Sequence, residues 1–352
     1  MDPIGKPVDE IQIIDLRSDT VTLPTREMLE SILTASLGDD KRGRNDPTVR
    51  KLEDLAAEKM GMEDALLVPS GTMGNSVSVL ANTERGNEVI VERNSHILKS
   101  ELGSWVIIGG LIPVTVMGKL GYMDPNDVEA AIRLEGRPKT GLICIENTHN
   151  NAGGIVITPK QTKAIWDVAK DHDLPVHTDG ERIFNAAVYL GTDVKKLTRY
   201  TDSVMFGLSK GLSAPVGSIV CGTEESIAKT RHYRNLLGGS MRQAGIIAAP
   251  GIIAITKMID RLREDHETAA MLAEGLRGIN GIKLLHPVQT NIIYFDVGGL
   301  GLTGNQFRDS MAKFGVKTGG GPRSALRVVT HRGITREDIK YTIDCVKKIA
   351  VK

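Results

Sequence analysis

The feature that most constrains the fold is an alternation of short apolar runs with helical patterns. The apolar runs lie at residues 65–68, 88–91, 112–116, 141–145, 174–177, 203–206 and 218–220. Between them lie patterns with helical spacing, such as residues 161–170. Strands that alternate with helices form a mostly parallel sheet with helices on both faces, so functional loops are expected at the carboxyl ends of the strands. The run at 218–220 follows residue 206 too closely for a crossover helix, which predicts one antiparallel pair.

The segments on either side of this alternation add a clear helix and a smaller unit. Asp46 is a suitable N-cap, and Pro47 a suitable first residue, for a helix that continues to Gly61. After a helical pattern from 244 toward 279, we expect strands near 282–285 and 291–297, a helix at 305–313, a strand at 326–329 and a final helix at 336–349. The expected fold class is therefore α/β, with a large domain at 1–255 and a small α+β domain at 256–352.

Composition argues against several classes of protein. The 352 residues include 44 basic and 43 acidic ones, and a net charge of +1 gives no electrostatic reason to expect a nucleic acid or an anionic membrane as partner. Cys144, Cys221 and Cys345 are widely spaced, which favours neither a disulfide framework nor a cysteine zinc site. Without a signal-like N-terminus or an apolar run of about 20 residues, the sequence predicts a soluble cytoplasmic protein.

Three fragments place binding or reactive groups at the ends of predicted strands. In the first, Ser70, Gly71 and Thr72 lie where an apolar strand turns into a helix. Backbone N–H groups and the positive end of a helix dipole suit a phosphate at such a turn. An ordinary strand-to-helix turn has the same pattern and is the simpler explanation of this fragment when it is considered alone.

The other two fragments supply an acid and an amine. Asp179 ends the apolar strand pattern, and a buried carboxylate there needs a cationic or proton-donating partner, although a helix-capping or salt-bridged aspartate explains it equally well. Lys210 follows the run 203–206, where partial desolvation favours the neutral amine that attacks carbonyls. An exposed loop lysine is the simpler alternative. Together, an acid, a nucleophilic amine and a phosphate cradle are the groups that pyridoxal phosphate requires.

Several blocks of the sequence resemble the L-threonine aldolase family, and they occur in the family's order over nearly the whole chain. They comprise residues 14–22, 38–40, 45–49, Glu146-Asn147-Thr148-His149-Asn150, His177-Thr178-Asp179-Gly180, Leu208-Ser209-Lys210-Gly211-Leu212, 215–217, Gly238-Gly239-Ser240-Met241-Arg242-Gln243 and 327–331. The resemblance implies the aspartate-aminotransferase-like fold type I of pyridoxal phosphate enzymes. It also implies that residues 1–255 bind the cofactor, and that the protein is a homotetramer built from dimers with shared active sites.

The resemblance implies a role for individual residues around the cofactor. Lys210 is similar to the Schiff-base lysine, Asp179 to the partner of the pyridine nitrogen, and His96 to the histidine that stacks on the ring. The positions that resemble contacts of the cofactor phosphate are Ser70, Gly71, Thr72, Ser209 and Arg242, the last of which would reach a neighbouring subunit.

A second group of residues resembles the family's substrate site. Ser18 and Arg327 are similar to residues that hold the substrate carboxylate, for which a bidentate guanidinium suits a planar anion, and Arg182 is similar to an arginine beside the ring and the substrate. The implied reaction cleaves a β-hydroxy-α-amino acid to glycine and an aldehyde, with His96 or His149 removing the hydroxyl proton directly or through water. No metal site is implied.

The sequence departs from the family pattern at several positions beside the expected pocket. Lys41 and Arg42 stand where the family has a tyrosine-containing turn, Glu181 replaces an alanine, and Asn235 replaces a lysine. Glu181 is a charge partner for Arg42 or Lys41 in one interpretation. We hypothesise from these changes of charge that the substrate preference is altered.

Three other functions stay open at this point. The same cofactor chemistry supports racemisation or β-elimination of an amino acid. Residues 299–304 match a dinucleotide-binding fingerprint, Gly299-Leu300-Gly301-Leu302-Thr303-Gly304, although no acidic residue follows at the expected spacing of about 20 residues. A non-catalytic scaffold is the third alternative.

Overall fold

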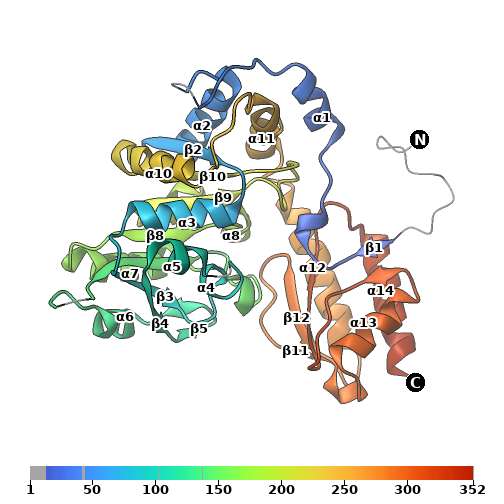
Figure 1. Ribbon diagram of the computed structural model, residues 1–352. Helices are drawn as coiled ribbons and strands as arrows, with labels where there is room; N and C mark the ends of the chain where they lie inside the picture. Colours follow the sequence, from blue (N-terminus) through green and yellow to red (C-terminus); the bar gives the residue numbers. More distant parts are fainter. Residues whose placement is uncertain (1–12, 42–43, 102, 137, 352) are drawn as a thin grey trace.

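The computed structural model describes residues 13–41, 44–101, 103–136 and 138–351. Its large sheet has seven strands in the order β2 (Asp64–Val68), β10 (Ser218–Gly222), β9 (Ser203–Gly207), β8 (Val176–Asp179), β7 (Thr140–Glu146), β3 (Glu88–Glu92) and β4 (Ile112–Val116). Helices surround this sheet, and a smaller group of elements lies to one side of it (Figure 1). The expected α/β fold with a central sheet is therefore confirmed.

The strands of the large sheet run in the predicted directions. β4, β3, β7, β8 and β9 are parallel neighbours, whereas β10 is antiparallel to both β9 and β2. The antiparallel pair inferred from the short spacing between residues 206 and 218 is thus confirmed, and the second antiparallel pair, of β10 with β2, was not predicted. The carboxyl ends of β3, β7, β8 and β9 consequently meet at one edge of the sheet.

Helices cover both faces of the sheet, and several short helices connect the strands. They are α2 (Pro47–Met60), α3 (Gly71–Ala81), α4 (His96–Lys99), α5 (Ser104–Gly109), α6 (Pro125–Ala131), α7 (Pro159–Asp171), α8 (Ile183–Leu190), α9 (Lys195–Thr198), α10 (Glu224–Leu236) and α11 (Gly245–Lys257). On β2, Ala65 and Leu67 belong to the hydrophobic cluster that includes α2, whereas Leu66 and Val68 belong to the one that includes α3. Because successive side chains of a strand point to opposite faces, a continuous apolar run is needed to bury both.

The first long helix begins and ends where the sequence predicts. The Asp46 side chain accepts hydrogen bonds from the backbone N–H groups of Thr48 and Val49, and Pro47 occupies the first turn. Gly61 ends α2 with φ of 67°, a left-handed conformation that costs glycine less than other residues. A helix α1 (Arg26–Leu33), which the sequence patterns did not predict, packs against α11.

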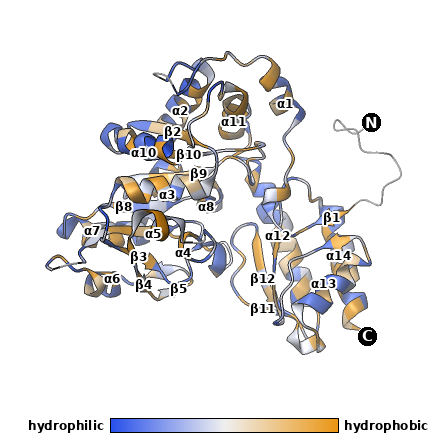
Figure 2. Cartoon of the chain, in the orientation of Figure 1, coloured by the Kyte–Doolittle hydropathy of each residue, from blue (hydrophilic) through white to orange (hydrophobic). Residues whose placement is uncertain are grey.

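The C-terminal part forms a second core. A three-stranded antiparallel sheet of β11 (Lys283–Leu284), β12 (Ile292–Asp296) and β14 (Ala325–Val329) packs with α12 (Leu262–Arg277), α13 (Gly304–Ala312) and α14 (Arg336–Ala350). The hydrophobic character of β12 is visible in Figure 2. Ile14 and Leu16 join the same cluster, because β1 (Ile14–Asp15) pairs in parallel with β13 (Val316–Lys317). The N-terminal segment therefore packs with the C-terminal core.

The predicted helical pattern from 244 toward 279 is divided into two helices, α11 and α12. The chain turns between Met258 and Leu262, and Leu262 still packs in the core around the large sheet. Later residues of α12, such as Ala269 and Leu272, belong to the C-terminal core. Helix α12 therefore connects the two cores, and the domain boundary after residue 255 stays a prediction.

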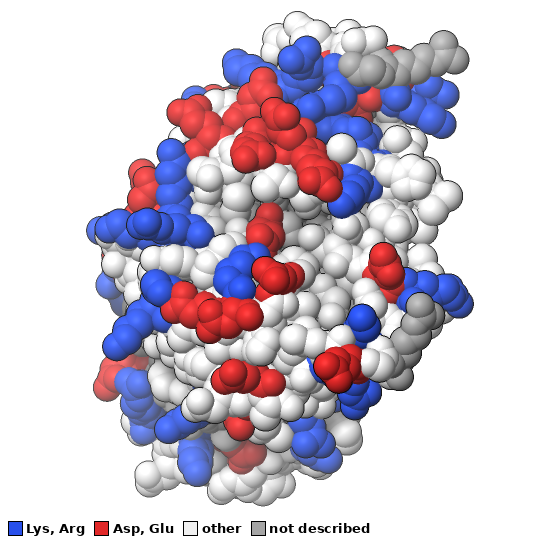
Figure 3. Space-filling model, turned by 90° about the vertical axis from the view of Figure 1, so that its left-hand side faces the viewer, with Lys and Arg blue, Asp and Glu red and all other residues white. Residues whose placement is uncertain are grey.

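The molecule also has a short hairpin after β4 and a surface of mixed charge. A hairpin of β5 (Gly118–Lys119) and β6 (Tyr122–Met123) lies between β4 and α6. Acidic and basic side chains are interspersed on the face shown in Figure 3. Within the described ranges, no helix is both long enough and apolar enough to cross a membrane.

Candidate active site

The carboxyl edge of the large sheet gathers the predicted reactive residues. β7 and β8 end in the register pair Glu146 and Asp179, so two acidic residues end neighbouring strands. His96 opens the short helix α4 just after β3, and Lys210 follows β9 by three residues. Each of these side chains therefore lies at the end of a buried parallel strand or within four residues after it.

Asp179 is a buried carboxylate with one unused oxygen. Its side chain is almost fully buried, and Oδ1 accepts a hydrogen bond from the backbone N–H of Glu181 at 3.2 Å. Oδ2 is buried and has no hydrogen-bond partner among the described residues. Burial, reinforced by the nearby carboxylates of Glu146 and Glu101, raises the pKa of Asp179 to about 8. A buried acceptor of this kind needs a proton donor, and the ionised form needs a cation.

His96 faces the same acidic group. Its Nδ1 lies 3.1 Å from Oε1 of the buried Glu101, and its backbone N–H donates to Glu146 at 2.7 Å. One nitrogen or oxygen from each of His96, Glu101 and Asp179 lies within 4.8 Å of the other two. The hydrogen bond with Glu101 raises the pKa of His96, and the charge of Asp179 acts in the same direction. The structure thus brings His96 and Asp179 together.

Lys210 forms an ion pair with Glu181. The Lys210 Nζ lies 3.2 Å from Glu181 Oε1, and both side chains are mostly buried. The loop that carries Lys210 is held by Thr22, whose hydroxyl donates to the Lys210 carbonyl at 2.9 Å. Glu181 therefore pairs with Lys210 and not with Lys41, which corrects one part of the sequence interpretation. Arg42, the other suggested partner, lies outside the described residues.

The first turn of α3 contains the residues that the sequence predicts for an anion. Ser70 is the N-cap, and its Oγ accepts a hydrogen bond from the Met73 N–H at 3.2 Å. The backbone N–H groups of Gly71 and Thr72 lie at the positive, N-terminal end of the helix. Within the described chain, they have no hydrogen-bond acceptor. Ser209 is partly buried between β9 and Lys210. These groups fit a phosphate.

Arg182 is held in place by a carboxylate that the sequence interpretation missed. Its Nε and Nη2 both donate to Asp19 at 2.7 Å, and its Nη1 lies 3.3 Å from Asn150 Oδ1. The Arg182 and Lys210 charges keep the pKa of Asp19 far below its usual range despite its complete burial. Asp19 also accepts from Asn291 Nδ2 at 3.1 Å. A bidentate pair of this kind fixes the guanidinium plane.

Arg327 retains an unused hydrogen-bond donor. It lies on β14 beside Tyr294 of β12, and its Nε is buried without a partner among the described residues. Burial and the neighbouring Arg182 lower the pKa of Arg327. Ser18 is the N-cap of the short helix that contains Asp19, and its Oγ accepts from the backbone N–H of Thr20 at 3.2 Å. The unpaired donor of Arg327 is suited to a carboxylate.

Two residues predicted for the site, His149 and Arg242, form polar contacts with groups other than Lys210 and Asp179. His149 is buried, its Nε2 lies 3.1 Å from Glu92 Oε2, and its Nδ1 is within 3.2 Å of the Ala152 N–H. Both ring nitrogens are therefore occupied. Arg242 is about half exposed and pairs with Asp39 at 3.0 Å. Within the described chain, neither side chain forms a hydrogen bond or an ion pair with Lys210 or Asp179.

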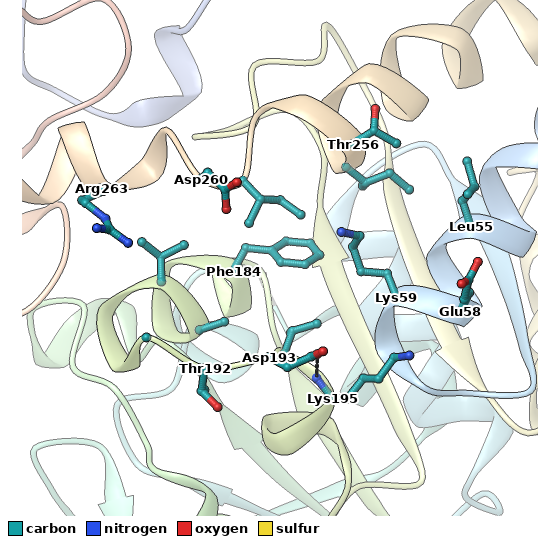
Figure 4. A pocket seen from close by; sticks show the side chains of 16 residues that line it. Leu55, Glu58, Lys59, Phe184, Thr192, Asp193, Lys195, Thr256, Asp260 and Arg263 are labelled. Atoms are coloured by element: carbon teal, nitrogen blue, oxygen red, sulfur yellow. Dashed lines mark hydrogen bonds between the residues drawn. The ribbon is translucent and has the colours of Figure 1, made fainter.

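A separate cavity of about 720 Å³ lies away from these residues. It is formed by α2, α8 and the turn between α11 and α12, and Phe184, Lys59 and Asp260 are among the side chains around it (Figure 4). None of the predicted site residues lines it. Volume alone therefore does not identify the reactive site in this chain.

The dinucleotide alternative does not fit the structure. The glycine-rich segment follows β12, whose partners β11 and β14 are both antiparallel to it. Residues Gly298–Leu300 form a single 3-10 turn before α13. A dinucleotide fingerprint requires a parallel βαβ unit, and this sheet does not provide one.

The residues at the carboxyl edge fit pyridoxal phosphate. The free Oδ2 of Asp179 suits the protonated nitrogen of a pyridine ring, Lys210 supplies the amine, and the first turn of α3 suits the phosphate. The unused donor of Arg327 suits the carboxylate of an amino acid. The sequence supplied no signal for Glu101 as the partner of His96, because Glu101 lies five positions later, beyond the end of α4, and no helical spacing joins the two residues.

Comparison with known proteins points to the same cofactor. The family described as Beta-eliminating lyase matches residues 15–298. Low-specificity L-threonine aldolase 1 of Arabidopsis thaliana is 43% identical over 343 residues, which are 95% of this chain and 96% of that protein. The low specificity L-threonine aldolase of Escherichia coli strain K12 is 38% identical over 337 residues, which cover 93% and 96% of the two chains.

Solved structures share the fold. The structure of a threonine aldolase of Leishmania major aligns with a TM-score of 0.81 at 19% sequence identity. The alignment covers 96% of this chain and 99% of that chain. An aspartate aminotransferase mutant from Thermus thermophilus gives 0.71 at 17% identity, with 98% and 99% covered. The sequence relatives, the family match and the shared fold lead to one conclusion: the chain belongs to the L-threonine aldolases of the β-eliminating lyase family, whose cofactor is pyridoxal phosphate.

Proposed function

We propose that the protein cleaves a β-hydroxy-α-amino acid of the threonine or allo-threonine type to glycine and an aldehyde, reversibly. The observation that carries the proposal is the unpartnered Asp179 Oδ2 at the same sheet edge as Lys210. When bound, pyridoxal phosphate supplies an electron sink for the pair left on the substrate Cα after the Cα–Cβ bond breaks. The relatives named for threonine cleavage support this reaction over β-elimination.

Each residue of the cofactor side has one task in this proposal. Asp179 holds a proton at the ring nitrogen, which keeps the ring electron-poor. Lys210 presents the amine that attaches the cofactor, and Ser70, Gly71, Thr72 and Ser209 surround the phosphate. Arg242 forms an ion pair with Asp39 of the same chain. In the proposed oligomer, the Arg242 side chain binds the cofactor phosphate of a neighbouring subunit instead.

The substrate carboxylate binds at Arg327. Arg327 and Arg182 share one buried carboxylate, that of Asp19, which pairs with Arg182, so the region beside Lys210 keeps a net positive charge. Ser18 adds a hydroxyl at the edge of this region. A carboxylate fixed there determines which bond at Cα is aligned for cleavage, because the amino group is tied to the cofactor.

His96 is the proposed general base for the substrate hydroxyl. Its Nδ1 is engaged by Glu101, so the Nδ1–H tautomer leaves Nε2 as an acceptor. His149 has both ring nitrogens engaged, and we assign it to the positioning of Glu92 and Glu146. A general base of this kind contributes about 10²- to 10⁴-fold to the rate.

Cell location and assembly belong to the proposal as well. Three buried free cysteines are consistent with a reducing cytoplasm. Leu23, Leu29, Leu33 and Leu37 are exposed on and around α1, which supports an interface between subunits. We propose a homotetramer in the cytoplasm with amino acids as its small-molecule substrates.

A panel of amino acids tests the reaction. The full-length enzyme, saturated with pyridoxal phosphate, is incubated with L-threonine, L-allo-threonine, L-serine and L-alanine, and the products are assayed for aldehyde, glycine, ammonia and the D-enantiomer. We expect equal amounts of glycine and acetaldehyde from at least one threonine isomer. Ammonia with a keto acid, or D-alanine without glycine, as the main product would contradict the proposal.

A further inference from the structure

The carboxylate of Glu181 lies against the first turn of α3, the segment to which we assign the cofactor phosphate. Its Oε1 lies 3.2 Å from Lys210 Nζ. A Cβ atom added to Gly71, in the first turn of α3, or to Gly207, at the end of β9, would overlap the Glu181 carboxylate oxygens. The side chain is therefore packed against two backbone segments that frame the cradle, with only 15% of it exposed.

Two positive groups hold this carboxylate. The N-terminal end of α3 carries a partial positive charge and points the N–H groups of Gly71 and Thr72 outward, and Lys210 contributes a full charge. An anion is stabilised at such a place whether it is a carboxylate or a phosphate. Two anions at the same place repel each other strongly, since the site is mostly shielded from water.

The path of the chain brings Glu181 to this position. Its backbone N–H donates to Asp179 Oδ1, and its carbonyl accepts from the Gly207 N–H at 3.4 Å. The residue is thus tied to the strand end that carries the ring-nitrogen partner. Its side chain has rotatable bonds beyond this anchored backbone, so the carboxylate can leave the cradle while Asp179 stays in place.

We propose that Glu181 is an internal competitor of the cofactor phosphate, which holds Lys210 and the first turn of α3 in the cofactor-free protein and is displaced when the cofactor binds. The proposal rests on the cofactor site assigned above. It predicts that the carboxylate weakens the binding of any small anion to the cradle. A ligand that joins a phosphate to an aldehyde gains a bond to Lys210 in addition, so it is favoured over free phosphate.

Removal of the charge tests this directly. Glu181→Gln keeps the size of the side chain, Glu181→Ala removes the side chain beyond Cβ, and Glu225→Gln removes an equal charge from a site that is 80% exposed. The three variants and the wild type are stripped of cofactor, and pyridoxal phosphate binding is measured by its visible absorbance. Inorganic phosphate binding is measured by calorimetry.

The expected result is a gain in affinity for both anions. Glu181→Gln and Glu181→Ala should bind pyridoxal phosphate and inorganic phosphate about tenfold more tightly than the wild type, because each loses a like-charge contact. Without cofactor, both should melt at a lower temperature than the wild type, since the end of α3 and Lys210 lose their counter-charge. Glu225→Gln should match the wild type in affinity.

Unchanged or weaker binding of both anions in the two Glu181 variants would overturn the proposal. Borohydride reduction of the loaded wild type separates this failure from a failure of the site itself. Label on Lys210 with no gain in affinity in the variants overturns only the role of Glu181. Absence of label on Lys210 overturns the cofactor site and the role of Glu181 together.

Discussion

The two sides of the site differ in which charge is left without a partner. On the sheet side, Asp179 Oδ2 and Glu101 Oε2 are buried acceptors with no hydrogen bond among the described residues. On the side formed by β14 and the N-terminal segment, Arg327 Nε is a buried donor with no partner, while Arg182 is neutralised by Asp19. One side lacks a proton donor and the other lacks an anion. A pyridine ring and an amino acid carboxylate supply these two groups.

The largest expected effect is on the acidic side. Asp179→Asn keeps the shape of the side chain but removes the charge that holds a proton on the ring nitrogen, so we expect glycine formation to fall by about 10³-fold. The measurement is kcat with saturating cofactor. Asp127→Asn, at an exposed position in α6, is the matched control. A loss of less than tenfold for Asp179→Asn would show that the acidic side does not act on the ring.

The next effect separates the two histidines of the acidic side. His96→Gln should lower kcat by about 10²-fold, because it removes the proposed base. His149→Gln should instead lower the melting temperature, because His149 is buried between Glu92 and Glu146. Steady-state rates and thermal unfolding of both variants provide the test. A larger kcat loss in His149→Gln than in His96→Gln would reverse the assignment.

The arginine side should respond through substrate binding. Arg327→Lys keeps the positive charge but loses the planar pair of donors, so we expect KM for the amino acid to rise by about tenfold with a smaller change in kcat. Arg323→Lys, at an exposed position near β14, is the control. If Arg327→Lys changed kcat alone and left KM untouched, the carboxylate would not bind at this side.

The last effect concerns the stability of the cofactor-free protein and does not involve catalysis. The pKa of Asp179 is about 8 in the folded state against 3.8 for the free side chain, so the folded state binds more protons between these values. Stability from this group is fully present below about pH 4 and is lost as the pH rises to about 8, with a slope of at most about 1.4 kcal/mol per pH unit.

Denaturant unfolding at about pH 5 and about pH 8 measures this loss. In Asp179→Asn the loss should be smaller than in the wild type, since asparagine does not titrate. An identical pH dependence in both proteins would show that Asp179 is ionised in the folded state over this whole range.

The sequence predicted the large sheet well because its signals are local. Most of its buried strands contain a run of apolar residues, although β8 consists of Val176, His177, Thr178 and Asp179, and the caps at Asp46 and Thr335 mark helix starts that the structure confirms. Lys210 and Asp179 were found because each lies within four residues of the end of such a run. Helix α1, by contrast, has eight residues, of which Met28 alone is fully buried.

The pairings within the site were harder to predict. Asp19 lies 163 positions before Arg182, and nothing in either local pattern joins them. Glu181 was recognised as a change of charge, but the choice of Lys210 as its partner depends on how the loops after β8 and β9 approach each other. Contacts of this kind follow from tertiary packing, which no spacing rule encodes.

Borohydride reduction of the holoenzyme followed by peptide mapping tests the central claim most directly. The account predicts a single stable pyridoxyl label, on the peptide that contains Lys210, and its loss in Lys210→Ala. A label on another lysine, or reduction without any label on the protein, would contradict it.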